Sequence, residues 1–163
     1  MIMEKLLVLT TGGTLDKVYF DALSEFQVGD AVAPHILTAM NVNFEFQHKE
    51  VCRKDSLELT DQDRQSLKSL IEASDAKYVL ITHGTDTMVE SANYIGEQSG
   101  KVIIFTGAMQ PAAFTNTDAV FNIGTAVGAF SVAQPGSYIA MSGQVYPATN
   151  VYKNYQTKRF EGM

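Results

Sequence analysis

Two short segments of the sequence combine hydroxyl groups with glycine. The first covers residues 10–14 (TTGGT), and the second covers residues 82–87 (THGTDT). Glycine has no Cβ, so its backbone turns sharply and its N–H groups can face a ligand. Asp86, in the second segment, adds a carboxylate that can polarise a hydroxyl or bind an ammonium group. These residue types predict a catalytic or binding site built from two glycine turns.

Both segments also have a purely structural interpretation. The first could be a tight turn with threonine caps, and Asp86 could cap the helix that follows it. His83 could stabilise its own turn through the hydrogen bonds of its ring. The functional interpretation gains support because each segment follows an apolar run, and ligands collect at the carboxyl ends of parallel strands. Two such turns would converge on one crevice.

The elements that must position these turns follow from the pattern of apolar residues. Strands are predicted at residues 6–10, 44–48, 78–82, 102–106 and 138–141, and a turn or hairpin at residues 144–151. Amphipathic stretches between them predict helices at residues 31–40, after 60–63, at 88–100 and at 118–130. This alternation predicts an α/β fold with a flavodoxin-like (Rossmann-like), mostly parallel sheet and helices on both faces.

Two of these helices have recognisable N-terminal signals. Asp30 is expected to be the N-cap of the helix at residues 31–40. Thr60 and Asp63 resemble a capping box in which Asp replaces the usual Glu. Behind this box the sequence places an apolar stripe of Leu67, Leu70 and Ile71.

Composition and charge limit the class of protein. The chain has 163 residues, is 45% hydrophobic and 18% charged, and contains one cysteine, Cys52, which excludes an internal disulfide framework. This is the size and composition of a single soluble domain. The net charge of −6 has the wrong sign for binding phosphates, so we expect no nucleic-acid partner. No apolar run approaches the roughly 20 residues of a membrane span, and we expect a cytoplasmic protein.

The motifs of several competing enzyme classes are missing from the sequence. It contains no GxxxxGK[ST], no GxGxxG and no GxSxG, which argues against an NTPase, a dinucleotide enzyme and a serine hydrolase. The three histidines, His35, His48 and His83, are scattered singly, and the sequence contains no H-x-x-x-H motif and no pair of cysteines. We therefore expect neither a metal nor a cofactor.

The segments TGGT (11–14), HGTDT (83–87) and TGAMQP (106–111) together resemble those of the bacterial-type L-asparaginases. The resemblance extends from residue 6 to about residue 151. It implies a hydrolase of asparagine catabolism, an amidohydrolase that converts L-asparagine to L-aspartate and ammonia without a cofactor. It also implies that residues 1–163 form one catalytic domain of the N-terminal type, without the smaller C-terminal domain of full-length members.

The resemblance implies catalytic roles for five residues. Thr14 would be the nucleophile, and Tyr19 would lie near it on a mobile segment. Thr85 would supply a second hydroxyl, and Asp86 would meet the substrate α-ammonium group. Lys153 would complete a network with Thr85. Direct attack by water on the amide is the alternative to a threonine nucleophile.

Other positions would bind the substrate. Asp55 and Ser56 resemble the loop whose serine holds the substrate α-carboxylate. Gly13 and Gly84 would contribute backbone groups, with N–H groups of the glycine turns stabilising the tetrahedral intermediate. This chain departs from the family pattern at Gln110, where the family has Arg, and at Leu57, where many members have a polar residue beside the serine.

Two other functions are compatible with this crevice. One is an amino-acid-binding module that has lost turnover, and the other is the amidase component of a tRNA-dependent amidotransferase. The presence of a threonine nucleophile candidate together with Lys153 favours the enzyme, and the acidic balance argues against the tRNA-dependent system.

The missing C-terminal domain would leave the crevice open to water. We therefore expect a homodimer or higher homo-oligomer in which a second copy shields the site. Candidates for this contact are the aromatic residues Phe114, Tyr146, Tyr152 and Tyr155. We also expect residues 17–29 to act as a lid that orders when substrate binds.

Overall fold

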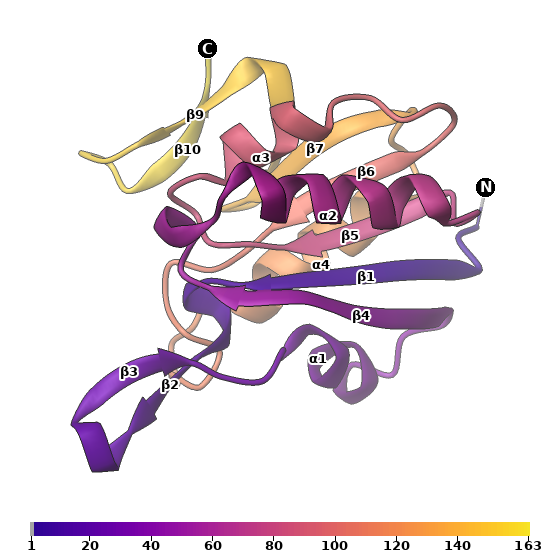
Figure 1. The fold of residues 1–163 in the computed structure, drawn as a ribbon. Helices are drawn as coiled ribbons and strands as arrows, with labels where there is room; N and C mark the ends of the chain where they lie inside the picture. The colour runs from indigo at the N-terminus through magenta and orange to yellow at the C-terminus, as the bar shows by residue number, and fades with distance from the viewer. Residues whose placement is uncertain (1) are drawn as a thin grey trace.

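The fold was determined as a computed structural model that describes residues 2–163. In this part of the chain six strands form the central sheet, in the spatial order β4-β1-β5-β6-β7-β8 (Figure 1). All neighbouring pairs are parallel except β7 and β8, which form an antiparallel edge. Their bounds are β1 (Lys5–Gly12), β4 (Glu45–Lys54), β5 (Tyr78–Thr82), β6 (Val102–Thr106), β7 (Gly136–Met141) and β8 (Gln144–Pro147).

Helices cover both faces of this sheet. Alternate residues of each strand point to opposite faces, so Leu6 and Val8 of β1 enter one core while Leu7 and Leu9 enter the other. The first core contains residues of α1 (Ala33–Ala39) and α4 (Ala119–Ala129). The second contains residues of α2 (Asp61–Ala73) and α3 (Met88–Ile95). The predicted α/β fold, with a mostly parallel sheet and helices on both faces, is confirmed.

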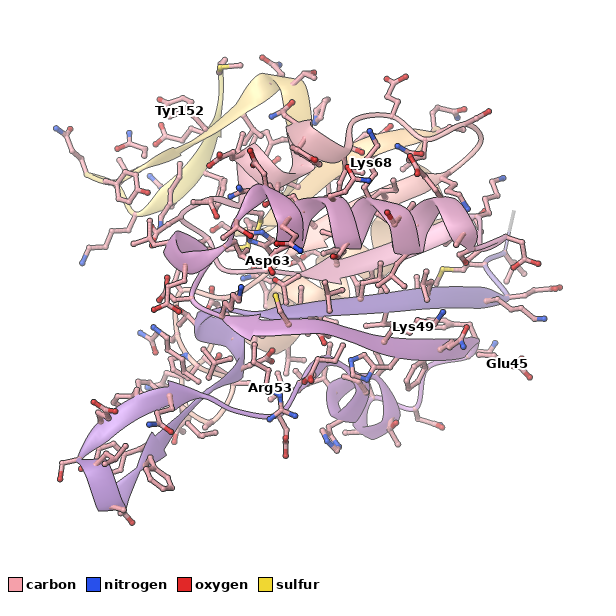
Figure 2. All side chains as sticks on the ribbon, in the orientation of Figure 1. Glu45, Lys49, Arg53, Asp63, Lys68 and Tyr152 are labelled. Atoms are coloured by element: carbon pink, nitrogen blue, oxygen red, sulfur yellow. The ribbon has the colours of Figure 1, made fainter. Side chains whose placement is uncertain are left out.

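The capping box at the start of α2 is also confirmed. The Thr60 hydroxyl accepts a hydrogen bond from the N–H of Asp63 at 3.2 Å, and the Asp63 carboxylate accepts one from the N–H of Thr60 at 2.9 Å. Asp63 also pairs with Lys54 at 2.8 Å, and Figure 2 shows Asp63 at this end of the helix, above β4. The pairing fixes the start of α2 against the end of β4.

Several predicted boundaries were wrong. The first helix begins at Ala33 with Val32 as its N-cap, and Asp30 instead forms an ion pair with Arg53 at 2.8 Å. The strand predicted at residues 44–48 extends over Glu45–Lys54. The helix predicted at residues 88–100 ends at Ile95, because Gly96 takes a left-handed φ of +63° that breaks the helix.

Two small hairpins lie outside the central sheet. The first consists of β2 (Lys17–Phe20) and β3 (Glu25–Val28), and the second of β9 (Val151–Asn154) and β10 (Arg159–Gly162). Figure 1 shows both hairpins at the end of the molecule toward which the parallel strands point. The fold therefore brings both hairpins to the carboxyl ends of the parallel strands, where the glycine turns lie.

Among the described residues, no helix combines the length and the apolar character that crossing a bilayer demands.

Candidate active site

The two glycine turns are in direct contact. Thr10 of β1 pairs with Thr82 of β5, so both turns start at the same level of the sheet. A Cβ placed on Gly13 would lie 2.5 Å from the backbone N and Cα of Gly84. Gly13 also has a φ of +83°, which glycine adopts without strain. The close approach explains why the first turn needs glycine where it touches the second.

A third loop lies against the second turn. A Cβ on Gly84 would lie 2.6 Å from the Cβ of Ser56. Ser56 is 2% exposed, and its Oγ accepts a hydrogen bond from the N–H of Thr87 at 3.3 Å. The Thr87 hydroxyl donates in turn to the carbonyl of Ser56 at 2.8 Å. The loop at residues 55–56 is therefore tied to the start of α3, immediately beside the glycine turns.

Lys153 bridges to the second glycine turn from the β9–β10 hairpin. Its Nζ donates hydrogen bonds to Thr85 Oγ1 at 2.8 Å and to Asp86 Oδ1 at 2.7 Å. The Lys153 side chain is only 13% exposed. The contact between Lys153 and Thr85 that the resemblance implied is present in the structure, while the catalytic roles of these residues stay predictions.

Asp86 does not cap the following helix. The N-cap of α3 is Thr87, whose own side chain makes no capping hydrogen bond. The Asp86 carboxylate instead accepts hydrogen bonds from Lys153 and from the hydroxyl of Tyr155, the latter at 3.0 Å. The hydrogen bond from Lys153 is the main cause of a pKa below the ordinary aspartate value, with smaller contributions from Tyr155 and from the charge of Lys17, while partial burial opposes them. Asp86 is therefore an anion at neutral pH.

His83 has the structural role that its position also allowed. Its Nδ1 lies 2.7 Å from the carbonyl of Gly84, and its Nε2 lies 2.8 Å from Ser91 Oγ. Burial lowers the pKa of His83 to about 4, so the ring is neutral at neutral pH. Because the Gly84 carbonyl can only accept, Nδ1 carries the proton and Nε2 accepts from Ser91. Arg64 completes the chain by donating its Nε–H to Ser91 Oγ at 2.9 Å.

Thr14 directly follows the contact between the glycine turns. It begins a short 3-10 helix, Thr14–Asp16, and is half-buried. The N–H of Gly13 donates to the carbonyl of Lys54 at 2.9 Å. This backbone group is therefore occupied by the Lys54 carbonyl, and the expectation that N–H groups of the glycine turns stabilise a tetrahedral intermediate stays a prediction.

Tyr19 lies on β2, five residues after Thr14 in the chain. Its ring packs edge-on against Phe26 of β3, with 5.4 Å between the ring centroids, and Phe26 contacts Phe114 at 5.6 Å. In the part of the chain that the structure describes, no hydrogen bond joins the Tyr19 hydroxyl to Thr14. The structure therefore places Tyr19 within the β2–β3 hairpin, as part of an aromatic cluster that connects the hairpin to the loop after β6.

Asp55 forms an ion pair with Lys17, a residue that the sequence analysis did not identify as part of the site. Lys17 Nζ lies 3.2 Å from Asp55 Oδ2, and the second oxygen of Asp55 accepts the N–H of Leu57 at 3.1 Å. Lys17 also contributes to the low pKa of Asp86. Its charge thus acts on two carboxylates of the site, although only its place beside the first glycine turn could have drawn attention to it.

The third motif is fixed beside these loops. Asp118 accepts hydrogen bonds from the N–H groups of Met109, at 2.9 Å, and Gln110, at 3.0 Å. A Cβ on Gly107 would collide with the carbonyl oxygen of His83. The residues described by the structure contain no group of three or more His, Cys, Asp or Glu side chains arranged to hold a metal ion. The site thus consists of hydroxyls, the Lys153–Asp86 and Lys17–Asp55 ion pairs and tightly packed glycine turns.

Comparison with known proteins identifies the family of this chain. Residues 5–162 match the family described as "Asparaginase, N-terminal". The chain is 29% identical over 164 residues to an L-asparaginase of Thermococcus kodakarensis, covering 91% of this chain and 47% of that protein. It is 25% identical over 179 residues to a glutaminase-asparaginase of Pseudomonas aeruginosa, covering 98% of this chain and 48% of that protein.

Solved structures show the same fold. The thermostable L-asparaginase from Thermococcus kodakarensis superposes with a TM-score of 0.81 at 24% identity, covering 98% of this chain and 51% of that one. A probable cytoplasmic L-asparaginase from Campylobacter jejuni gives a TM-score of 0.81 at 23% identity, covering 98% of this chain and 52% of that one. The chain spans about half the length of these relatives. The family match over nearly the whole chain shows that the protein belongs to the asparaginase family, within its N-terminal domain.

Proposed function

We propose that the protein hydrolyses the side-chain amide of L-asparagine, with Thr14 as the nucleophile. The observation that carries the proposal is the pair of hydrogen bonds from Lys153 to Thr85 and Asp86, in a turn that touches the turn of Thr14 through Gly13 and Gly84. A threonine hydroxyl attacks an amide only when neighbouring groups manage its proton and receive the oxyanion. Family membership supports an amidohydrolase of this kind.

The α-ammonium and α-carboxylate groups of the substrate would each meet a complementary side chain. Asp86 is an anion at neutral pH and would pair with the α-ammonium group of asparagine. The Ser56 hydroxyl accepts one hydrogen bond and still has its own proton, which it would donate to the α-carboxylate. Asp55 and Lys17 lie at the edge of this region as an ion pair. These contacts would hold the side-chain amide toward Thr14.

In the first proposed step Thr14 Oγ1 bonds to the amide carbon while its proton passes to a neighbouring base or water. The negative charge on the former carbonyl oxygen would be received by backbone N–H groups of the Gly84 turn. Collapse of the intermediate breaks the C–N bond, and a proton delivered to the leaving nitrogen releases ammonia. Water then attacks the ester carbon and frees aspartate and Thr14.

Thr85 would transfer protons in these steps, and Lys153 would assist it. Because Lys153 donates to Thr85 Oγ1, the Thr85 proton must point away from the ammonium group. Thr85 can then donate that proton to the departing nitrogen or orient the attacking water. Lys153 favours this transfer because a nearby positive charge stabilises an oxygen that is giving up its proton.

The test is release of ammonia from L-asparagine, with L-glutamine and a β-aspartyl peptide as comparison substrates. We expect turnover of L-asparagine above that of both. If calorimetry shows that L-asparagine binds but none of the three substrates releases ammonia, the proposed enzymatic activity is wrong. The protein would then be an amino-acid-binding module.

We further propose that the protein works as a homodimer or larger homo-oligomer. Support comes from exposed aromatic residues near the site, including Phe114 and Phe26, with 41% and 48% of their surface exposed. Two of the expected contact residues have roles within one protomer, because Tyr146 donates to the carbonyl of Phe160 and Tyr155 donates to Asp86. Light scattering across a dilution series, with activity measured in parallel, tests this proposal. A monomer mass at full activity would contradict it.

A further inference from the structure

One tyrosine, Tyr155, contacts both members of the Lys153–Asp86 ion pair. The Tyr155 hydroxyl donates to Asp86 Oδ1 at 3.0 Å, the same oxygen that accepts from Lys153 Nζ at 2.7 Å. The Lys153 ammonium also lies 4.8 Å from the centroid of the Tyr155 ring, within the range of a cation–π interaction. A single side chain therefore restrains the carboxylate with its hydroxyl and the ammonium with its ring.

The hairpin explains why Tyr155 and Lys153 act on the same side. The hairpin brings both side chains to Asp86, Lys153 from β9 and Tyr155 from the turn that follows it, while Tyr152, the neighbour of Lys153 in the strand, points to the opposite face. Figure 2 shows Tyr152 on the outer side of the hairpin, and its side chain is 42% exposed. Val151 and Phe160, each 2% exposed, fix the hairpin to the core. The orientation of Tyr155 thus follows from how the hairpin docks.

The restraint matters because the pair is only partly shielded from water. Exposed ion pairs gain little, since holding two flexible side chains in one geometry costs conformational entropy. The Asp86 side chain is 30% exposed and Lys153 has four rotatable bonds in its side chain. A rigid ring that contacts both groups reduces the number of arrangements that the pair can adopt.

We propose that Tyr155 is a positioning residue, whose hydroxyl orients the Asp86 carboxylate and whose ring holds the Lys153 ammonium against Thr85. The importance of this positioning for turnover rests on the proposed amide hydrolysis. The positioning itself is a property of the free protein and can be measured without substrate.

The charged and titratable groups that act on Asp86 come from two hairpins. Lys153 and Tyr155 act from the β9–β10 hairpin, and Lys17 acts from β2. All three lower the pKa of Asp86. Loss of the Tyr155 hydroxyl removes one of them and leaves the other two, so the pKa of Asp86 must rise toward its ordinary value.

The experiment uses Tyr155→Phe, which removes only the hydroxyl, and Tyr155→Leu, which removes the ring as well. Matched controls are Tyr152→Phe and Tyr152→Leu on the opposite face of the same hairpin. Carbon-13 NMR of the aspartate side-chain carboxyls follows the titration of Asp86 in each variant. Steady-state kinetics with L-asparagine give kcat, KM and the pH dependence of kcat/KM.

We expect Tyr155→Phe to move the Asp86 titration and the acid limb of kcat/KM to higher pH, by about half a unit. We expect Tyr155→Leu to lower kcat about tenfold in addition, because the ring no longer restrains Lys153. The Tyr152 variants should leave the Asp86 titration as it is in the unmodified protein, because Tyr152 is not among the groups that shift the pKa of Asp86. Folding of all variants is checked by circular dichroism, and Tyr155 is 64% exposed, so that its substitution leaves the core intact.

An Asp86 titration in Tyr155→Phe and Tyr155→Leu that matches the Tyr152 controls would overturn the proposal, whatever the kinetics show. If the unmodified protein releases no ammonia but the Asp86 titration moves in both Tyr155 variants, the positioning role holds and the proposed amide hydrolysis fails.

Discussion

The buried carboxylate of Asp16 accepts a hydrogen bond from the N–H of Val32, with 3.0 Å between Oδ1 and N. The Asp16 carbonyl also accepts the N–H of Gly29 at 2.8 Å. Asp16 therefore closes the base of the β2–β3 hairpin, two residues after Thr14. Burial raises the pKa of Asp16 to about 7, helped by the charge of Glu50 and opposed by the Val32 hydrogen bond and by Arg53.

Asp16→Asn is expected to change how stability depends on pH. The unfolded chain loses the Asp16 proton near pH 3.8, while the folded protein keeps it until about pH 7. This group therefore stabilises the fold fully below pH 3.8, and that contribution is lost as the pH rises to about 7, by at most about 1.4 kcal/mol per pH unit. The variant cannot ionise, so its stability relative to the unmodified protein should rise from pH 5 to pH 7 and then level off. Urea unfolding at pH 5, 6, 7 and 8 measures this difference. A difference that stays constant with pH would contradict the buried ionisation.

Gly13→Ala is expected to destabilise the fold and to abolish the site. The new Cβ would lie 2.5 Å from the backbone of Gly84, and the φ of +83° disfavours alanine. Together these effects should cost roughly 2–4 kcal/mol. Gly124→Ala on α4 is the control, because its Cβ would meet nothing within 4 Å and alanine favours a helix by roughly 0.5–1 kcal/mol. Urea unfolding separates the two, and equal stability of both variants would mean that the turns are not in close contact.

Thr14→Ala is expected to lower kcat by about three orders of magnitude or more while binding of asparagine partly survives. Thr14 is half-buried and its hydroxyl makes no hydrogen bond to the described part of the chain, so the fold should remain intact. Thr14→Ser keeps the hydroxyl and tests its positioning, and we expect an intermediate rate. Rates of Thr14→Ala close to those of the unmodified protein would exclude Thr14 as the nucleophile and favour direct attack by water.

Lys153→Met should lower kcat by roughly 10²–10⁴-fold with a smaller effect on KM, because it removes the charge at similar length. It should also raise the pKa of Asp86, since the hydrogen bond from Lys153 is the main cause of its low value. Lys158→Met, in the exposed turn of the same hairpin, serves as the control. Should only KM increase, Lys153 would be a binding residue and would have no part in proton transfer.

The β2–β3 hairpin is expected to exchange its amide hydrogens rapidly and to slow at least tenfold when asparagine or aspartate binds. Most of its residues are exposed, and the Lys17–Asp55 ion pair and the contact of Phe26 with Phe114 connect it to the rest of the protein. Mass spectrometry of peptides from residues 17–29 follows this change, with buried β5 as the internal reference. Slow exchange without ligand that is unchanged by ligand would exclude a lid.

The sequence predicted the five parallel strands of the central sheet because their signals are local, whereas β8 was expected only as part of a turn or hairpin. Strand β6 has the predicted bounds, Val102–Thr106, since each of its five residues is apolar or buried and the strand is enclosed on both faces. The capping box of Thr60 and Asp63 was also predictable, because both partners lie within one turn of helix. The β2–β3 hairpin was not predicted as strands, because most of its residues are exposed and its pattern carries no burial signal.

The sequence by itself determined that two hydroxyl-rich glycine turns follow parallel strands, because apolar runs and turn residues are properties of neighbouring positions. It left open whether Asp86 caps α3 or pairs with a distant cation. Only the tertiary structure decided this, by joining Asp86 to Lys153 and Tyr155, which lie 67 and 69 positions away. That choice depends on how Val151 and Phe160 pack the last hairpin onto the core, and packing between remote segments leaves no periodic signal in the chain.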